Sequence, residues 1–421
     1  MLLKDKNILL GITSSIAIYK SLELIRLYVK AGANVKVIMT KASQKFITPL
    51  TFEAISQNKV LCEDTETWDK HEDYNHIDIG KWADIFVLAP CTANTINKLS
   101  NGIADNLLTQ TALAYPRIKL LAPAANTNMI KNPITRASLK MLKLCNFEII
   151  DSQVKELACK DVGDGAMAEA QDIFYATARE LLKDEYWDNR KVVLSGGGTI
   201  EKIDEVRYIS NFSSGKMASS LALALYLKGA DVCLISTRGY EDLPKQIHTI
   251  GVDSSDQMYE YLVDSIRVAK KGKVSNATLM DDSKQHLIQK KPYLFMVAAV
   301  SDYKPKFPQN GKLKKETIGS NWNLQLVENI DILSSLDKSD IYAIGFKAEM
   351  DSQNGFKNGK NMMEKKDLDG VCLNILKDSS SFGSNSNEID LILKDNTFNF
   401  KGEKLNISID ILEKLEDEFP L

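Results

Sequence analysis

Short apolar runs alternate with helical spacing along the first half of the chain. The segment 7–11 is an apolar run of the kind found in strands buried on both faces, and 16–30 has the spacing of an amphipathic helix. Apolar strands separated by helices are typical of parallel β-α-β units, so we expect a doubly wound sheet. The further strands predicted here are 34–39, 84–89, 119–122 and 147–150.

The same pattern starts again in the second half. A charged segment at 181–190 precedes a new strand at 191–194, a glycine-rich turn at 195–199 and a helix at about 214–228. Later strands are predicted at 231–235, 293–298, 342–346 and 370–373, followed by a hairpin at 388–400 and a last helix at 407–418. We therefore expect an α/β protein with two doubly wound, Rossmann-like domains, at 1–188 and 189–421.

Length, charge and composition exclude several classes of function. A chain of 421 residues suits two or three domains, and a net charge of −3 gives no general attraction for nucleic acid or an anionic membrane. Anionic ligands must then be held by backbone amides, helix N-termini and single lysines. There is no membrane-length apolar run or signal-peptide pattern, and the six cysteines stand singly, so we expect a cytoplasmic protein. The polar, lysine-rich stretch 268–291 is predicted to be a surface insertion.

Hydroxyl and small side chains gather where two strands of the first half are predicted to end. The second strand ends without the acidic residue that would hold the ribose of NAD, which favours a mononucleotide such as FMN. Helix capping alone would explain the serines equally well. The candidate cofactor-binding residues are Gly11, Ser14, Ser15, Thr40, Pro90, Thr92, Ala93 and Asn94.

Three single residues of the first half could carry chemistry. His76 is a candidate acid or base, Asn126 follows an apolar strand, and Cys159 lies in a loop that Gly163 and Gly165 should make mobile. Each has a plainer alternative, namely a surface histidine, a turn asparagine and an unreactive thiol.

Three motifs in this half occur together and in order. They are H-I-D-I-G-K-W-A-D at 76–84, P-x-x-N-x-x-M at 123–129 and C-x-x-x-G-x-G-x-M at 159–167. Jointly they resemble the homo-oligomeric flavin-containing cysteine decarboxylases, and within them the phosphopantothenoylcysteine decarboxylases. Lys160 and Ala166 stand where those proteins usually have glycine and arginine.

This resemblance implies a flavodoxin-like domain that binds FMN. The thiol-bearing carbon of the substrate would be oxidised to a thioaldehyde, whose sulfur accepts electrons as the carboxylate leaves as CO2; hydride and a proton would then be returned. His76 would be the base, Asn126 would hold the substrate carboxylate, and Cys159 would be the proton donor.

The second half contains an unusual segment at 206–217, V-R-Y-I-S-N-F-S-S-G-K-M. Its residues 211–215 present amides and hydroxyls just before a helix, which suits a phosphate or carboxylate. Asp302 follows a buried strand and could hold a ribose, a base or a metal ion. Lys312 begins a lysine-rich turn that could neutralise phosphate charge, although such a turn is more often plain solvated surface.

Together these segments resemble the phosphopantothenate–cysteine ligases, and the two halves in this order resemble the fused bacterial form of the two enzymes of coenzyme A biosynthesis. The implied ligation uses CTP: the carboxylate of 4'-phosphopantothenate attacks the α-phosphate, pyrophosphate leaves, and the amine of L-cysteine attacks the acyl-cytidylate. Decarboxylation of the product then gives 4'-phosphopantetheine. Mg2+ would be held mainly by the CTP phosphates.

The resemblance also assigns residues of the second half. Asn211 would contact the acyl intermediate and Lys312 would stabilise its formation. Lys365 competes with its neighbours for a triphosphate role because the lysine spacing differs from the usual one. The residues placed around CTP are Met296, Val297, Ala298, Asp302, Lys312, Ile330, Asp331, Ile332, Leu333, Phe346, Lys360 and Lys366.

By the same resemblance, we expect a homo-oligomer. Flavin domains would form trimers with FMN at the subunit interface and ligase domains would form dimers, which a dodecamer would satisfy. Two other interpretations remain. One is a regulatory flavin-binding protein with a degenerate second domain, which the retained candidate residues disfavour. The other is a peptidyl-cysteine decarboxylase, which the whole second domain disfavours.

Overall fold

The computed structural model describes residues 1–68, 75–156, 162–274, 287–314, 316, 319, 321–351, 353–376 and 383–420. The described chain forms two compact units that divide between Leu182 and Lys183, a little before the boundary predicted at 188. The charged segment after this division is no simple linker, because the ring of Trp187 is buried and lies 4.8 Å from the ring of Tyr293 in the second unit.

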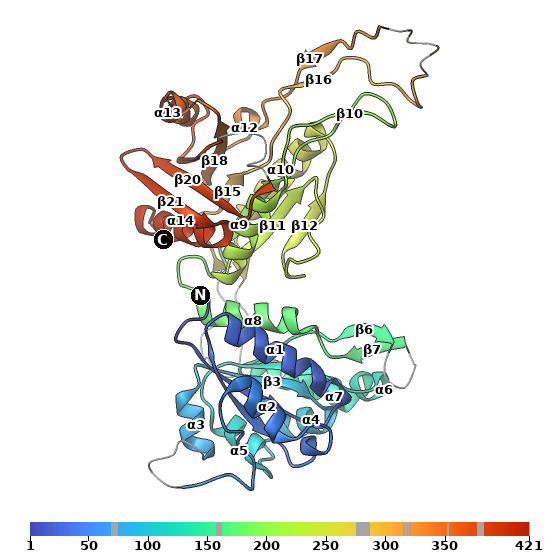
Figure 1. The fold of residues 1–421 in the computed structure, drawn as a ribbon, viewed down its shortest axis with the longest axis vertical. Helices are drawn as coiled ribbons and strands as arrows, with labels where there is room; N and C mark the ends of the chain where they lie inside the picture. Colours follow the sequence, from blue (N-terminus) through green and yellow to red (C-terminus); the bar gives the residue numbers. More distant parts are fainter. Residues whose placement is uncertain are drawn as a thin grey trace. The chain divides into compact units, whose positions relative to one another are not determined.

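The first unit is built on a parallel five-stranded sheet with the order β2-β1-β3-β4-β5 (Figure 1). This is the flavodoxin-like order, in agreement with the expected fold class. The strands of the sheet are β1 (Asn7–Ile12), β2 (Asn34–Met39), β3 (Ile85–Cys91), β4 (Lys119–Pro123) and β5 (Phe147–Ile149). The hairpin of β6 (Gln153–Glu156) and β7 (Val162–Ala166) follows them.

Helices cover both faces of this sheet. The helix α1 (Tyr19–Lys30) packs against α8 (Ala170–Leu182), where the hydroxyls of Tyr28 and Thr177 are hydrogen-bonded at 2.7 Å. The remaining helices are η1 (Ile16–Ile18), η2 (Ser43–Lys45), α2 (Pro49–Ser56), α3 (His76–Trp82), α4 (Ala93–Ser100), α5 (Leu107–Ala114), α6 (Thr127–Lys131) and α7 (Pro133–Leu144).

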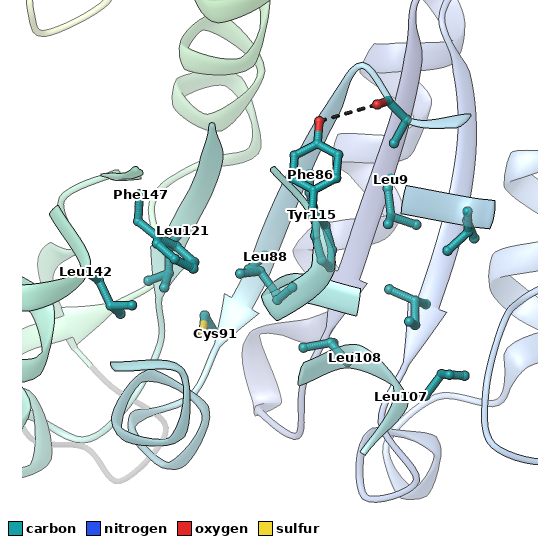
Figure 2. Close-up of a cluster of buried hydrophobic side chains, with 14 of the residues drawn as sticks. Leu9, Phe86, Leu88, Cys91, Leu107, Leu108, Tyr115, Leu121, Leu142 and Phe147 are labelled. Carbon is teal, nitrogen blue, oxygen red and sulfur yellow. Dashed lines mark hydrogen bonds between the residues drawn. The ribbon is translucent and has the colours of Figure 1, made fainter. Parts of the chain in front are cut away.

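The core on the second face joins strands to α3, α4, α5 and α7 (Figure 2). Phe86 and Leu88 of β3 pack against Leu108 of α5, and the hydroxyl of Tyr115 donates to the carbonyl of Ala83 at 3.4 Å. Burial of these apolar side chains is the main stabilising contribution on this face and fixes the strand ends that follow.

The second unit has one mixed sheet with the order β12-β11-β8-β15-β18-β19-β20-β21. The strands from β12 to β19 are parallel and, numbered along the chain, have the Rossmann order 3-2-1-4-5-6. The hairpin predicted near the end of the chain is confirmed as the antiparallel pair β20 and β21. These strands are β8 (Lys191–Gly196), β11 (Asp231–Ser236), β12 (His248–Gly251), β15 (Tyr293–Met296), β18 (Tyr342–Glu349), β19 (Gly370–Ile375), β20 (Ser386–Leu393) and β21 (Thr397–Glu403).

The helices and small hairpins of the second unit complete the fold. The pair β16 and β17 extends away from the main sheet as an arm that the sequence analysis did not predict (Figure 1). The helices are α9 (Lys216–Leu227), α10 (Ser255–Ala269), α12 (Ile332–Ser335), α13 (Gly355–Lys365) and α14 (Lys404–Glu418). The short strands are β9 (Glu201–Lys202), β10 (Tyr208–Ile209), β13 (Lys273–Val274), β14 (Leu287–Ile288), β16 (Tyr303–Pro305) and β17 (Leu326–Glu328). None of the helices formed by the described residues has the length and apolar character to cross a membrane.

Candidate functional site

In the first unit, two strand ends meet at the point where the strand order reverses. The order reverses between β1 and β3, and ligands of doubly wound sheets bind outside the carboxyl ends of strands at such a point. The hydroxyl of Thr13 joins the two ends: it donates to the carbonyl of Pro90 at 2.8 Å and accepts the N–H of Thr92 at 3.0 Å. The turn after β1 and the turn after β3 therefore form one edge.

The candidate cofactor residues lie along this edge, with one exception. Ser14 and Ser15 are half-buried, Thr92 caps α4 by accepting the N–H of Thr95 at 3.4 Å, and Asn94 is exposed in the first turn of α4. Ala93 starts α4, and the N–H of Thr40 donates to the carbonyl of Ile12 at 3.1 Å at the same edge.

Gly11 is the exception, because packing accounts for it. The residue is buried within β1, and an added Cβ would lie 2.9 Å from side-chain atoms of both Leu88 and Phe86. Its missing side chain makes room for core residues. The hydroxyls and helix N-termini of the other residues still suit the phosphate and ribityl chain of FMN.

The loop that carries Asn126 lies under the β6–β7 hairpin. Asn126 caps α6, and its Oδ1 accepts the N–H of Asn128 at 2.9 Å. Gly165 accepts the N–H of Ala125 at 3.1 Å through its carbonyl, and an added Cβ on Gly165 would lie 2.0 Å from the Ala125 oxygen. A Cβ on Gly163 would similarly lie 2.1 Å from the Thr127 hydroxyl.

Gly163 and Gly165 therefore lie in a strand and not in the loop expected for them. Both are buried in β7, and the close approach of the hairpin to the Asn126 loop is what requires glycine at these positions. Cys159 and Lys160 lie outside the described residues. Ala166 ends β7.

His76 is the first residue of α3 and has a carboxylate partner. Its Nδ1 lies 3.0 Å from Oε1 of Glu66, and the ring of Trp68 contacts it edge-on at 5.4 Å between centroids. The structure does not bring His76 together with Asn126, because α3 and α6 lie on opposite sides of the first unit (Figure 1).

In the second unit, residues from four separate segments line one cavity of about 420 Å³. This cavity lies beside the carboxyl ends of β15 and β18. It is lined by most of the residues that the resemblance places around CTP: Met296, Ala298, Asp302, Ile330, Asp331, Ile332, Leu333, Phe346 and Lys366. Val297, Lys312, Lys360 and Lys365 are not among its described lining residues.

One lysine and one aspartate in the lining of this cavity form an ion pair. Lys366 Nζ lies 2.9 Å from Asp331 Oδ2, while Lys360 and Lys365 on α13 are exposed to solvent. Burial raises the pKa of Asp331, but hydrogen bonds from Lys366 and Ser334 outweigh it and hold the pKa below its ordinary value. Of the three competing lysines, Lys366 alone is among the described residues that line this cavity.

Two residues that fix the backbone around this cavity were missed from the sequence. Asn329 donates to the carbonyl of Ser301 at 2.9 Å and to the hydroxyl of Ser255 at 2.8 Å, which joins two walls of the cavity. The buried hydroxyl of Ser195 accepts the N–H groups of Val297 and Ala298, both at 3.1 Å. Neither residue has a local sequence signal, because a serine in a glycine-rich turn and an asparagine in a loop are common.

A second cavity of about 160 Å³ shares Ala298 and Phe346 with the first. It lies at the start of α9, and its described lining contains two lysines, Lys347 and the mostly buried Lys404, but no acidic residue. Burial, with a contribution from nearby Lys216, lowers the pKa of Lys404 below its ordinary value. The described lining therefore carries two basic side chains and no carboxylate, and Lys347 pairs with Glu349 just outside it at 3.1 Å.

Asn211 and Lys312 lie on two segments that are hydrogen-bonded to each other. Asn211 Nδ2 donates to the carbonyl of Val300 at 2.9 Å. The carboxylate of Asp204, which is buried, accepts the N–H of Leu313 at 3.1 Å, and Arg207 donates to the Leu313 carbonyl at 3.3 Å. The exposed Lys312 thus sits on a loop held by the segment that leads to Asn211.

Over the described part of the chain, no group of three or more His, Cys, Asp and Glu side chains is arranged to hold a metal ion. The five described cysteines are all free thiols.

The fold and these sites define a two-domain α/β protein with a candidate nucleotide-binding edge in each domain. Two family models match it: Flavoprotein over residues 2–182, and the DNA/pantothenate metabolism flavoprotein C-terminal domain over residues 187–271 and 266–418. The chain belongs to the family of coenzyme A biosynthesis bifunctional proteins, as the motifs indicated. It is thus a bifunctional enzyme of coenzyme A biosynthesis.

The curated relatives match along nearly the whole chain. The coenzyme A biosynthesis bifunctional protein CoaBC of Borreliella burgdorferi is 35% identical over 93% of this chain and 94% of its own length. That of Bacillus subtilis is 33% identical over 98% and 97%. Among solved structures, the FMN binding protein AtHal3 is 33% identical, with 42% of this chain and 97% of that chain covered and a TM-score of 0.37.

Proposed function

We propose that the second domain ligates L-cysteine to 4'-phosphopantothenate with CTP and that the first domain decarboxylates the product with FMN. The observation that carries the ligase half is the gathering of scattered CTP candidates around one cavity. The domain limits 1–188 and 189–421 are part of this proposal. So is a location in the cytoplasm, where the free thiols of the described cysteines would persist.

In the ligase half, CTP occupies the larger cavity. Asp302 and the 330–333 segment hold the nucleoside, and Lys366 turns from Asp331 toward the triphosphate, whose charge is greater. Mg2+ is brought mainly by the phosphates, because no described carboxylate cluster would hold it alone.

The acceptor substrate occupies the smaller cavity. 4'-Phosphopantothenate is an anion at both ends, and Lys347, Lys404 and the start of α9 favour such a ligand. Because the two cavities share Ala298 and Phe346, the substrate carboxylate can reach the α-phosphate of CTP. Lys312 then stabilises charge on the phosphoryl group, and Asn211 holds the acyl-cytidylate for attack by the amine of cysteine.

In the decarboxylase half, FMN lies along the edge that Ser14, Ser15 and Thr92 form with the start of α4. When bound, the flavin supplies reversible two-electron oxidation of the thiol-bearing carbon of the substrate. Asn126 holds the substrate carboxylate, His76 accepts the thiol proton, and Cys159 returns a proton after CO2 has left. The β6–β7 hairpin is docked against the loop of Asn126 through Gly163 and Gly165.

The separation of His76 from Asn126 supports a site shared between subunits. A histidine on one side of the unit can meet an asparagine on the other only across an interface. Trimers of the first domain would supply that interface, and dimers of the second would link the trimers into a dodecamer.

The flavin half is tested by whether the purified protein keeps its cofactor. We expect a yellow protein with the absorbance of oxidised flavin and about one flavin per chain. A correctly assembled protein that retains none after reconstitution with FMN refutes the decarboxylase assignment.

The ligase half is tested by following the acyl-cytidylate in a pulse experiment with labelled CTP. Lys312→Gln should block its formation, whereas Asn211→Asp should let it accumulate by slowing its consumption. Equal amounts of intermediate in the two variants would refute this division of roles.

A further inference from the structure

Glu66 is held in place by a turn that is anchored to the first sheet. Leu61 extends the sheet beside β2, since its N–H donates to Val37 at 2.8 Å and its carbonyl accepts from Met39 at 2.9 Å. The hydroxyl of Thr65 then accepts the N–H of Cys62 at 2.9 Å. Because the turn is hydrogen-bonded to the sheet, the backbone position of Glu66 is fixed by the sheet.

His76 is fixed from its own side as well. Asn75 caps α3 by accepting the N–H groups of Ile77 at 3.0 Å and Asp78 at 2.9 Å, which sets the backbone from which the imidazole departs. The edge-on ring of Trp68 adds a second contact to the imidazole. Both partners of the Glu66–His76 pair are about a quarter or less exposed.

The chemistry of the pair determines where the proton of the imidazole lies. An ionised carboxylate can only accept, so Nδ1 of His76 must donate to Glu66. In a neutral imidazole the other nitrogen, Nε2, then carries the lone pair. A base at Nε2 is what deprotonation of a thiol needs.

We propose that Glu66 is a positioning residue of the decarboxylation: its carboxylate keeps the proton of His76 on Nδ1 and leaves Nε2 as the base that meets the substrate thiol. This inference rests on the proposed role of His76. It goes beyond that role because it identifies the reacting nitrogen and the residue that selects it. No motif singled out Glu66.

Other charged groups on the packed elements are few. The turn of Glu66 also carries the exposed Glu63 and Asp64, and α3 carries Asp78 and Lys81, which pair with each other at 3.8 Å. The neighbouring α5 and β1 contain no charged residue. Glu66 is therefore the charged partner of the imidazole among the described residues.

The test compares Glu66→Gln and Glu66→Ala with Glu63→Gln, which removes a carboxylate from the same turn without touching His76. The full-length holoenzyme is labelled with 15N-histidine; the chain has only four histidines, and loss of a signal in His76→Gln assigns the relevant one. We expect neutral His76 to be protonated at Nδ1 in the wild type and in Glu63→Gln. In Glu66→Ala a substantial fraction should shift to the Nε2-protonated form.

Kinetics with phosphopantothenoylcysteine supply a second readout. In both Glu66 variants kcat should fall on the order of tenfold or more while KM changes less than about twofold.

Two outcomes separate the inference from the function it rests on. If Glu66→Ala keeps the wild-type tautomer and kcat while His76→Gln is inactive, the positioning role is overturned and the function stands. If His76→Gln itself decarboxylates normally, the role of His76 fails and the inference fails with it.

Discussion

Lys365 and Lys366 are neighbours in the sequence but lie in different surroundings. Lys366 faces the larger cavity and pairs with Asp331, whereas Lys365 is exposed on α13. The sequence left these lysines and Lys360 as competitors for the triphosphate. The position of each side chain relative to the cavity favours Lys366.

Lys366→Met should therefore raise the KM for CTP about 10- to 100-fold, the cost of losing one hydrogen bond to a charged group. Lys365→Met is the matched control and should leave that KM within about twofold. Pyrophosphate release under saturating 4'-phosphopantothenate measures both. A larger effect for Lys365→Met would contradict the assignment.

The lowered pKa of buried Lys119 predicts a pH dependence of protein stability. Burial lowers its pKa to about 8, and its ammonium donates to the Tyr115 carbonyl at 2.7 Å. Between pH 8 and the ordinary lysine value of 10.5, the unfolded chain binds more protons at this position than the folded chain. Its contribution to stability is therefore complete above that window and is lost as the pH falls through it.

Accordingly, the free energy of unfolding of the wild type relative to Lys119→Met should rise between pH 8 and pH 10. Urea unfolding at both pH values, followed by a signal from the first unit, measures the difference. The exposed Lys140→Met serves as the reference and should show no such change. A difference that falls with pH would show that the lysine is not desolvated.

At the scale of elements, the close packing of the β6–β7 hairpin against the Asn126 loop requires its two glycines. Gly165→Ala places a carbon 2.0 Å from the Ala125 oxygen, a backbone atom that cannot move aside cheaply. The hairpin should shift by about an ångström, and decarboxylation should fall on the order of 100-fold. CTP-dependent ligation should be unchanged.

Gly239→Ala is the control for that substitution, because an added carbon there would meet no atom within 4 Å. Both steps are measured on the same preparation. Full decarboxylase activity in Gly165→Ala would mean that the docked hairpin seen here is not the active arrangement.

The main strands were predictable because their apolar patterns are local. The predicted strand 34–39 coincides with β2, and the hairpin near the end of the chain was found from its turn residues. The arm of β16 and β17 was not found, since its strands are short, largely exposed and paired only with each other. The function of Gly163 was misjudged because a close approach of two segments leaves no local signal.

The residues of the candidate sites also divide into those with a local sequence signal and those without one. Motifs gave the CTP candidates of the second unit, and most of them line one cavity. Asn329, Ser195 and Glu66 were missed, because each acts through a hydrogen-bonded partner that is distant in the sequence.

At the scale of the whole molecule, the opposite placement of α3 and α6 predicts a site shared between subunits. His76→Gln and Asn126→Asp should each abolish decarboxylation alone. Co-expression of the two variants should restore part of it, because some interfaces then combine an intact His76 with an intact Asn126. No recovery in verified mixed oligomers would place both residues in a site of one chain.

The central claim is that one polypeptide joins CTP-dependent ligation to flavin-dependent decarboxylation. The most direct measurement supplies the purified protein with 4'-phosphopantothenate, CTP, Mg2+ and L-cysteine labelled with 13C at the carboxyl carbon. We predict labelled CO2, 4'-phosphopantetheine and pyrophosphate in equal amounts, with no labelled CO2 when CTP is omitted. Labelled CO2 that appears without CTP, or ligation product that is never decarboxylated by flavin-loaded protein, would contradict the account.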